Sequence, residues 1–357
     1  MTALGTPPED DEFELTLLGP GYGESIVLHV GDGAWILVDS CGRADAPAAL
    51  AYLRALGLNP ASVVVLIVAT HWHDDHIRGI AQMVEVCTNA AFCCSSVLCQ
   101  EEFLTAVRAL ERRHFASFGS GLREIHGTFT RLRAAGVHPV WALANRPILS
   151  EDRCQVWSLA PADEAFSSFL RALGRLLPPA GQAETRVPSL SPNDAAVVLW
   201  VTVGDIAVLL GSDLERRRWS TIVQDAARPA GKASAFKVPH HGSESAHEPR
   251  VWESLLEPEP VAVITPWRRG RRFVPNRQDR RRILDLTANA YVSATVDSTT
   301  PVRRRVRMVE RMVRESGIRI RRAPTPDAVR LRRRIAAGDS WEVERFGSAC
   351  HLRDFAV

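Results

Sequence analysis

The chain has 357 residues, of which 46% are hydrophobic and 24% are charged, and its formal net charge is +3. This composition is typical of a globular protein with a sizeable core, and it excludes a disordered or collagen-like chain. Because no run of about 18 uncharged apolar residues occurs and the acidic N-terminus lacks the features of a secretion signal, we expect a cytoplasmic protein without a membrane segment.

Cysteine usage agrees with that compartment. The seven cysteines are an odd number and show no paired C-x-x-C spacing. We therefore interpret most of them as small buried hydrophobic residues and not as ligands of a structural zinc site.

The first 70 residues predict an antiparallel group of strands followed by one fully buried strand. Three apolar runs separated by Gly-rich turns predict strands over 13–18, 25–30 and 34–38. Small and apolar residues at helical spacing, ending at Gly57, predict a helix over 47–56. The β-branched run at 63–69 is typical of a strand that is buried on both faces.

From there to residue 265, predicted helices alternate with predicted strands. Helices are expected over 77–86, 101–135 and 249–256, with a further polar helix after Asp213. Strands are expected over 137–143, 155–159, 195–201, 206–210, 235–238 and 261–265, and a loop over 178–192. Strands with intervening helices, repeated in two halves, predict an α/β fold in which a sandwich of sheets is covered by helices.

A cluster of histidines and aspartates follows the predicted strand at 63–69 directly. Imidazole nitrogens and carboxylates are ligands that zinc and related first-row cations prefer. At the histidine frequency of this chain, such a pattern arises by chance with a probability on the order of one in a thousand. Loops at strand ends are also the places where a rigid sheet aims catalytic groups. The cluster therefore predicts a metal site.

A family resemblance is carried by this cluster, which reads THWHDDH at 70–76. It resembles the H-x-H-x-D-H signature of the metallo-β-lactamase superfamily, whose fold is an αββα sandwich. The resemblance implies that His71 and His73 bind a first metal and that Asp75 and His76 bind a second, while Asp74 occupies the variable position. Two divalent ions are expected, with zinc as the first choice and manganese as the alternative.

Two later segments fit the same pattern. The apolar run 208–210 leads to Asp213, which looks like the family's bridging carboxylate. The segment FKVPHHGS at 236–243 looks like its late histidine motif. We assign His240 to metal binding and His241 to catalysis, and the reverse assignment stays open.

The family's middle histidine has no counterpart in this sequence. The corresponding place after a strand reads LAPAD at 159–163, so a carboxylate stands where an imidazole is usual. Asp163 is our candidate for the replacing metal ligand, although a surface aspartate after proline is equally common. Three other histidines could substitute, each more often an ordinary helix or surface residue: His114, His126 and His138.

Within the superfamily, the chain is most similar to the metallo-hydrolase domain of bacterial competence DNA-uptake channels and their soluble relatives. The similarity spans roughly residues 13–297 and is carried by the segments GPGYGES at 19–25, ILVD at 36–39, SPND at 191–194, KVPHHGS at 237–243 and VAVIT at 261–265. The lack of membrane segments argues against a channel.

The resemblance implies hydrolysis by a hydroxide that bridges two metals. Asp213 would bridge the ions, Asp75 would orient the nucleophile as well as bind metal, and His241 would donate a proton or a hydrogen bond to the substrate. Asp39, at the end of its strand, is a candidate acceptor that fixes a histidine tautomer, with an ordinary turn residue as the alternative.

A phosphodiesterase or nuclease acting on nucleic acid or a nucleotide is the favoured function. The resemblance points to it, and from Arg268 to Arg334 there are 21 arginines against six acidic residues, a net charge of +15 that leaves about −12 elsewhere. A general arginine bias is the simpler explanation, because Lys232 and Lys237 are the only lysines in the sequence. The first alternative is a hydrolase of small lactone, amide or thioester substrates, and the second is a non-catalytic metal-binding regulatory module.

We expect a hydrolase domain over 13–300 and a basic C-terminal extension over 301–357. Apolar residues among the arginines of the extension predict an amphipathic helix near 306–313, with a solvated arginine face as the plain alternative. The segment 341–346 is predicted to add a strand to a sheet edge. The sequence identifies no protein partner.

Overall fold

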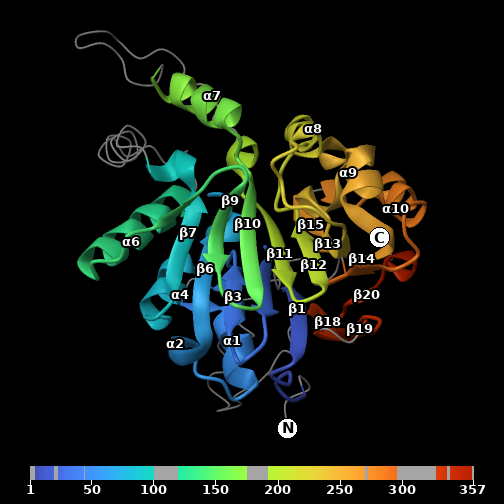
Figure 1. Cartoon of the computed structure of the whole chain (residues 1–357), viewed down its shortest axis with the longest axis horizontal. Helices are drawn as coiled ribbons and strands as arrows, with labels where there is room; N and C mark the ends of the chain where they lie inside the picture. The colour runs from blue at the N-terminus through green and yellow to red at the C-terminus, as the bar shows by residue number, and fades with distance from the viewer. Residues whose placement is uncertain are drawn as a thin grey trace, which may run out of the picture.

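A computed structural model describes residues 5–19, 23–43, 45–99, 120–174, 192–269, 272–295, 327–335 and 338–355. Its architecture is an αββα sandwich of two eight-stranded sheets (Figure 1), which confirms the predicted fold class. In the described part of the chain, no helix is long and apolar enough to cross a membrane.

The first sheet combines the N-terminal strands with two strands from near the end of the chain. Its strands, in spatial order, are β19 (Glu342–Phe346), β18 (Ala328–Arg334), β1 (Glu12–Leu18), β2 (Ser25–His29), β3 (Trp35–Val38), β6 (Val64–Ala69), β7 (Ala91–Ser95) and β8 (Val140–Ala142). The opening β1–β2–β3 is antiparallel, as predicted, and β3, β6, β7 and β8 then run parallel to one another.

The second sheet is built from the later part of the chain. Its strands, in order, are β20 (Cys350–His351), β17 (Ala290–Val292), β14 (Leu256–Ile264), β13 (Ala233–Lys237), β12 (Ile206–Leu210), β11 (Val198–Val203), β10 (Cys154–Ala160) and β9 (Arg146–Ser150). The four strands β12, β13, β14 and β17 pair in parallel, so their carboxyl ends meet at one edge.

Helices cover the outer face of each sheet. The helices beside the first sheet are α1 (Ala48–Ala55), α2 (Pro60–Val63), α3 (Asp74–Ile77), α4 (Ile80–Val86) and α6 (Ser120–Ala134). Those of the second half are α7 (Asp163–Gly174), α8 (Arg216–Gln224), α9 (Pro249–Ser254) and α10 (Arg277–Leu284). Figure 1 shows α4 and α6 on one side of the molecule and α8, α9 and α10 on the other. Two short ribbons stand outside the sheets: β4 (Gly42–Arg43) with β5 (Ala46–Pro47), and β15 (Trp267–Arg269) with β16 (Arg272–Val274).

Three apolar layers hold the sandwich together, because alternate side chains of a strand point to opposite faces. On β6, Leu66 and Val68 pack between the two sheets, whereas Ile67 and Ala69 pack under the helices of the first half. The second sheet behaves in the same way, with Leu199 facing the first sheet and Trp200 facing α8 and α9. The prediction that 63–69 is buried on both faces is confirmed.

Residues near the end of the chain belong to the sandwich. Strand β18 pairs with β1 from Glu12 opposite Arg334 to Leu18 opposite Ala328. Figure 1 shows β18 and β19 in red beside the blue β1. The strand predicted over 341–346 is confirmed as the edge strand β19. Part of the predicted extension is thus built into the first sheet, while the predicted helix near 306–313 lies outside the described residues.

Candidate metal centre

Polar side chains from both sheets meet where their parallel strands end. Asp39 follows β3, the histidine run follows β6, and Asp213 and His241 follow β12 and β13. Two of these strand exits turn sharply: Asp39 and His241 both have a φ of 58°, in the left-handed region. Such a backbone aims the side chain back over the strand ends, where the two sheets face each other.

The entry to β2 also needs a special residue. Gly23 has a φ of 86°, and a side chain at this position would collide with the Asp75 carbonyl. The close approach lets the Glu24 N–H donate to the Asp75 carbonyl oxygen at 2.9 Å. Glu24, which is 1% exposed, is thereby held inside the cluster.

The first group of potential ligands consists of His71, His73 and Asp213, whose donor atoms all lie within 4.8 Å of one another. His71 Nε2 lies 3.0 Å from His73 Nδ1. Burial lowers the pKa of His73, and it lowers that of His71 well below its ordinary value. Both imidazoles are therefore neutral, and a neutral imidazole offers a lone pair to a metal.

The second group consists of Asp75, His76 and His241, again within 4.8 Å of one another. Asp213 joins the two groups, because its Oδ2 lies 3.4 Å from His76 Nε2 and 3.6 Å from His241 Nε2. His241 Nε2 is also 3.6 Å from Asp75 Oδ2. The arrangement places one carboxylate between two clusters of imidazole and carboxylate donors.

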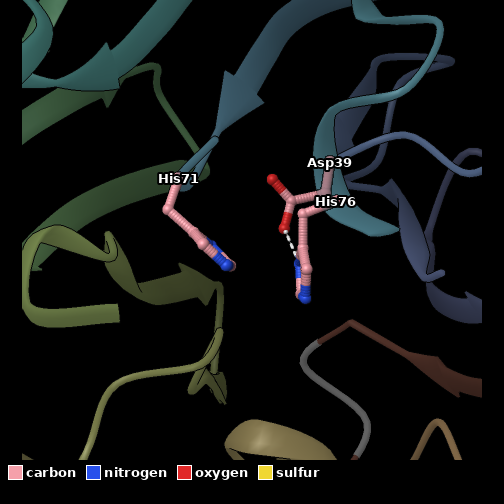
Figure 2. A group of neighbouring side chains, drawn as sticks. All are labelled: Asp39, His71 and His76. Atoms are coloured by element: carbon pink, nitrogen blue, oxygen red, sulfur yellow. Dashed lines mark hydrogen bonds and ion pairs between the residues drawn. The ribbon is translucent and has the colours of Figure 1, made fainter. Parts of the chain in front are cut away.

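The outer nitrogens of both imidazoles in the second group are already engaged. Asp39 Oδ2 lies 2.8 Å from His76 Nδ1 (Figure 2), and the Thr265 carbonyl oxygen lies 3.1 Å from His241 Nδ1. Asp39 is itself fixed, since it accepts hydrogen bonds from the Thr70 N–H at 2.8 Å and the Thr70 hydroxyl at 2.7 Å. These contacts fix the ring tautomers and leave each Nε2 facing Asp213. The interaction predicted for Asp39 is present.

The donor set fits divalent metal ions. Buried polar atoms normally have a hydrogen-bond partner, yet His76 Nε2 and Asp213 Oδ1 have none among the described residues. Burial alone would raise the pKa of Asp213, but His76, His241 and Lys237 hold it well below the usual range, so the carboxylate is ionised. Imidazole nitrogen and carboxylate oxygen that lack a hydrogen-bond partner are the donors that a zinc-like cation requires.

Two buried side chains of the centre, those of Lys237 and Glu24, were not predicted as site residues from the sequence. Lys237 is fully buried, and its Nζ lies 2.5 Å from Glu24 Oε1, 3.0 Å from the Ser212 carbonyl oxygen and 3.8 Å from Asp213 Oδ1. Glu24 Oε2 lies 3.8 Å from His241 Nδ1. Two features of the sequence could have indicated these residues: a glutamate in the glycine-rich turn before β2, and a lysine in a chain whose basic residues are nearly all arginine.

The structure brings most of the predicted ligands together and leaves two apart. His71, His73, Asp75, His76 and Asp213 lie in the cluster. Of the adjacent histidines, it is His241 that joins them, whereas the His240 side chain is 28% exposed and lies 3.1 Å from the Ser245 hydroxyl. In the described part of the chain, neither His240 nor the exposed Asp163, the first residue of α7, belongs to a group of potential ligands.

The proposed substitutes for the middle histidine do not join the cluster either. His126 lies on α6 and His138 is exposed before β8, and neither belongs to a ligand group among the described residues. His114 lies outside the described residues.

Comparison with known proteins agrees with this geometry. Residues 18–139 match the family model described as the metallo-beta-lactamase superfamily. Comparison with curated proteins gives no match.

Solved structures with some likeness include three metallo-beta-lactamases. MIM-2 is 14% identical, covering 71% of this chain and 84% of that one, with a TM-score of 0.38. SMB-1, bound to 2-mercaptoethanesulfonate, is 14% identical, covering 66% and 82%, with a TM-score of 0.37. The enzyme from Cronobacter sakazakii is 17% identical, covering 62% and 76%, with a TM-score of 0.33. Likeness at this level does not bear on the substrate.

Proposed function

We propose that this chain is a metal-dependent hydrolase of the metallo-beta-lactamase superfamily that cleaves phosphodiesters, since residues 18–139 match the model of that family. The observation that carries the proposal is the joined cluster, in which Asp213 lies between a group containing His71 and His73 and a group containing His76 and His241. The superfamily consists mostly of metal-dependent hydrolases, and this donor set suits divalent cations.

We assign His71, His73 and Asp213 to one ion and Asp75, His76, His241 and Asp213 to the other. Divalent cations held there would lower the pKa of a water molecule and offset negative charge that develops on the attacked group. The protein's own part is orientation: Asp39 and the Thr265 carbonyl oxygen fix the imidazoles of His76 and His241. We propose that the Asp75 carboxylate binds metal and also orients the nucleophile, the two roles that the family resemblance implies for it.

His240 takes the role that was first considered for His241. Its imidazole is partly exposed beside the cluster, and burial lowers its pKa, so it is neutral near pH 7. A neutral, accessible imidazole can donate a hydrogen bond from its N–H group to a substrate, or accept a proton at its other nitrogen. We therefore propose that His240 donates a hydrogen bond to the substrate and that His241 is the ligand.

A phosphodiester is favoured as substrate by the arginine-rich segment that begins three residues after Thr265, at the edge of the cluster. The late motif at 237–243 also supports a relationship to the hydrolase domain of competence channels, since Lys237 and His241 both face Asp213. A small lactone or thioester would gain nothing from a row of guanidinium groups.

The test is hydrolysis of bis-p-nitrophenyl phosphate by the zinc- or manganese-loaded wild type, by His73→Ala and by the matched control His138→Ala. We expect His73→Ala to lose more than about 100-fold in kcat/KM, which exceeds what loss of an outer partner of a ligand costs. His138→Ala should retain full activity. Hydrolysis of lactones or thioesters without any diester hydrolysis would favour the small-substrate alternative, and bound metal without hydrolysis of either would favour the binding module.

A further inference from the structure

Asp74 occupies the variable position of the run 71–76 and, among the described residues, belongs to no group of potential ligands. Its Oδ1 instead accepts a hydrogen bond from the Gly121 N–H at 2.5 Å. Gly121 is the second residue of α6, a helix of 15 residues, and the first N–H groups of a helix lack partners within it. The Asp74 carboxylate therefore caps α6 from outside, where it also interacts favourably with the helix dipole.

The same contact brings the backbone of α6 against the backbone of the run. A side chain at position 121 would collide with the Trp72 carbonyl oxygen, so glycine is needed for this close approach. Trp72 and Asp74 are the two neighbours of the proposed ligand His73 in the sequence. The first turn of α6 therefore lies against the run on both sides of His73.

Helix α6 also provides a carboxylate that binds the chain just after the run. Glu124 Oε1 accepts hydrogen bonds from the N–H groups of Gly79 at 3.2 Å and Ala81 at 3.1 Å. Both N–H groups belong to the start of α4, which begins at Ile80, three residues after α3 ends. A carboxylate of the metal-binding run thus caps α6, and a carboxylate of α6 caps α4.

These side-chain contacts alternate along the chain with the proposed ligands. The first is at Thr70, whose N–H and hydroxyl donate to a carboxylate at the end of β3. The second is at Asp74, and the third is at 79–81. The ligands within 71–73 lie between the first two contacts, and those at 75–76 lie between the second and the third. The second and third contacts both depend on α6.

From this alternation we propose that Asp74 and Glu124 are positioning residues of the metal centre and that they couple the docking of α6 to metal binding. The proposal rests on the metal centre of the proposed function and is independent of the substrate. Contacts on both sides of Asp75 and His76 restrict the backbone that carries them, and ligands held in place beforehand lose less conformational entropy when metal binds. Because such coupling is reciprocal, metal binding must strengthen the docking of α6 by the same factor.

The zinc affinity of variants, measured by competition with a zinc-binding dye, tests the proposal. We expect Asp74→Ala and Glu124→Ala to bind zinc about tenfold more weakly, at the lower end of what loss of a residue that supports ligands from outside costs. Asp74→Asn should recover most of that loss, because it keeps an oxygen acceptor at the same place. The matched control is Glu85→Gln, since Glu85 of α4 joins α6 through an exposed ion pair with Arg131 at 3.1 Å, and such pairs contribute little.

Hydrogen exchange of backbone amides gives a second readout, which a helix cap without coupling to the metal would not change. Zinc should slow exchange at Gly79, Ala81 and Gly121 of the wild type by about tenfold, the factor expected for the affinity. The protection that zinc gives to Gly121 should be lost in Asp74→Ala and kept in Glu85→Gln.

The proposal would be overturned by zinc affinities of Asp74→Ala and Glu124→Ala that equal that of Glu85→Gln, or by exchange rates that zinc leaves unchanged in the wild type. An Asp74→Asn variant as weak as Asp74→Ala would also contradict it. Glu124→Ala acts on α4 instead of α6, so a folding defect in one variant leaves the other to decide. If zinc binding shows this coupling but the wild type hydrolyses no diester, the proposed function fails and the positioning role stands.

Discussion

Two buried polar networks in this molecule differ in how completely their atoms are paired. In the first sheet, Glu14 accepts hydrogen bonds from the Tyr52 hydroxyl at 2.6 Å, the Thr16 hydroxyl at 2.8 Å and Arg332 Nε at 2.9 Å. In the metal centre, Glu24, His76 and Asp213 each have a buried atom without a hydrogen-bond partner among the described residues. Since buried polar atoms are normally satisfied, the complete network is structural and the incomplete one is arranged for a ligand.

The Glu14 network, formed by Glu14, Tyr52, Arg330, Arg332 and Glu344, explains why a strand from near the end of the chain joins the first sheet. Arg332 of β18 pairs with Glu14 of β1 at 2.8 Å, and Arg330 pairs with Glu344 of β19 at 2.6 Å. Some of the arginines that looked like a nucleic-acid surface, those at Arg330 and Arg332 of β18, therefore hold strands together.

The largest effect is expected from Lys237→Met in the metal-free protein. Removing one member of a buried ion pair leaves a charge without a partner, so the free energy of unfolding should fall by about 3–5 kcal/mol. Chemical denaturation measures it, with Lys232→Met as the control, since Lys232 is exposed and donates to the Glu253 carbonyl oxygen. Glu24→Gln combined with Lys237→Met should recover part of the loss. Strict additivity of the two single losses would show that the pair is not coupled.

A smaller loss of stability is expected from Tyr52→Phe, which acts on the Glu14 network. A hydrogen bond to a buried carboxylate contributes about 1.5–3 kcal/mol, so the free energy of unfolding should decrease by that amount. The metal content should not change, and Tyr291→Phe in β17 provides a matched control. Loss of metal in Tyr52→Phe would mean that the two networks are not separate.

Asp39→Asn should weaken metal binding while leaving the fold intact. Asp39 fixes His76 by its contact with Nδ1 of that imidazole, and loss of such a partner costs about 10- to 100-fold in metal affinity. Competition with a zinc-binding dye measures the affinity. Asp32→Asn serves as the control, because Asp32 precedes the same strand at its other end and is exposed. Equal affinities of the two variants would contradict the role given to Asp39.

The smallest effect concerns pH. His29 is 1% exposed, and burial lowers its pKa below the ordinary value of 6.5, although the Glu12 carbonyl oxygen at 2.8 Å opposes this. The unfolded chain therefore binds a proton before the folded chain does. This contribution to stability is present above about pH 6.5 and is lost as pH falls from there through the lower pKa of the folded state. His29→Gln should make the acid-induced loss of stability shallower than it is in wild type or His138→Gln. An identical slope in all three would contradict this account.

Local patterns were sufficient to predict the elements that carry most ligands. The β-branched run before His71 and the histidine spacing both lie within 14 residues, so strand β6 and the ligand cluster that follows it could be predicted from the sequence. The Glu24–Lys237 pair could not be predicted, because it joins the entry of β2 in one sheet to the end of β13 in the other. Only the packing of the two sheets creates that contact.

The sequence could not show which of the two adjacent histidines joins the cluster. The backbones of His240 and His241 both lie in the left-handed region, with φ of 48° and 58°, and this conformation decides which imidazole enters the cluster. Periodicity in the sequence cannot reveal such a turn. Asp163 was favoured because it follows a strand and a proline, but there the chain turns directly into α7 and the side chain is exposed.

We propose that the incomplete network holds two ions that share Asp213. Elemental analysis after dialysis against metal-free buffer measures this directly for wild type and Asp213→Asn. We expect about two ions per chain in wild type and at most one in the variant, because the carboxylate is common to both sites. Equal metal content in the two proteins, or no bound metal in wild type, would contradict it.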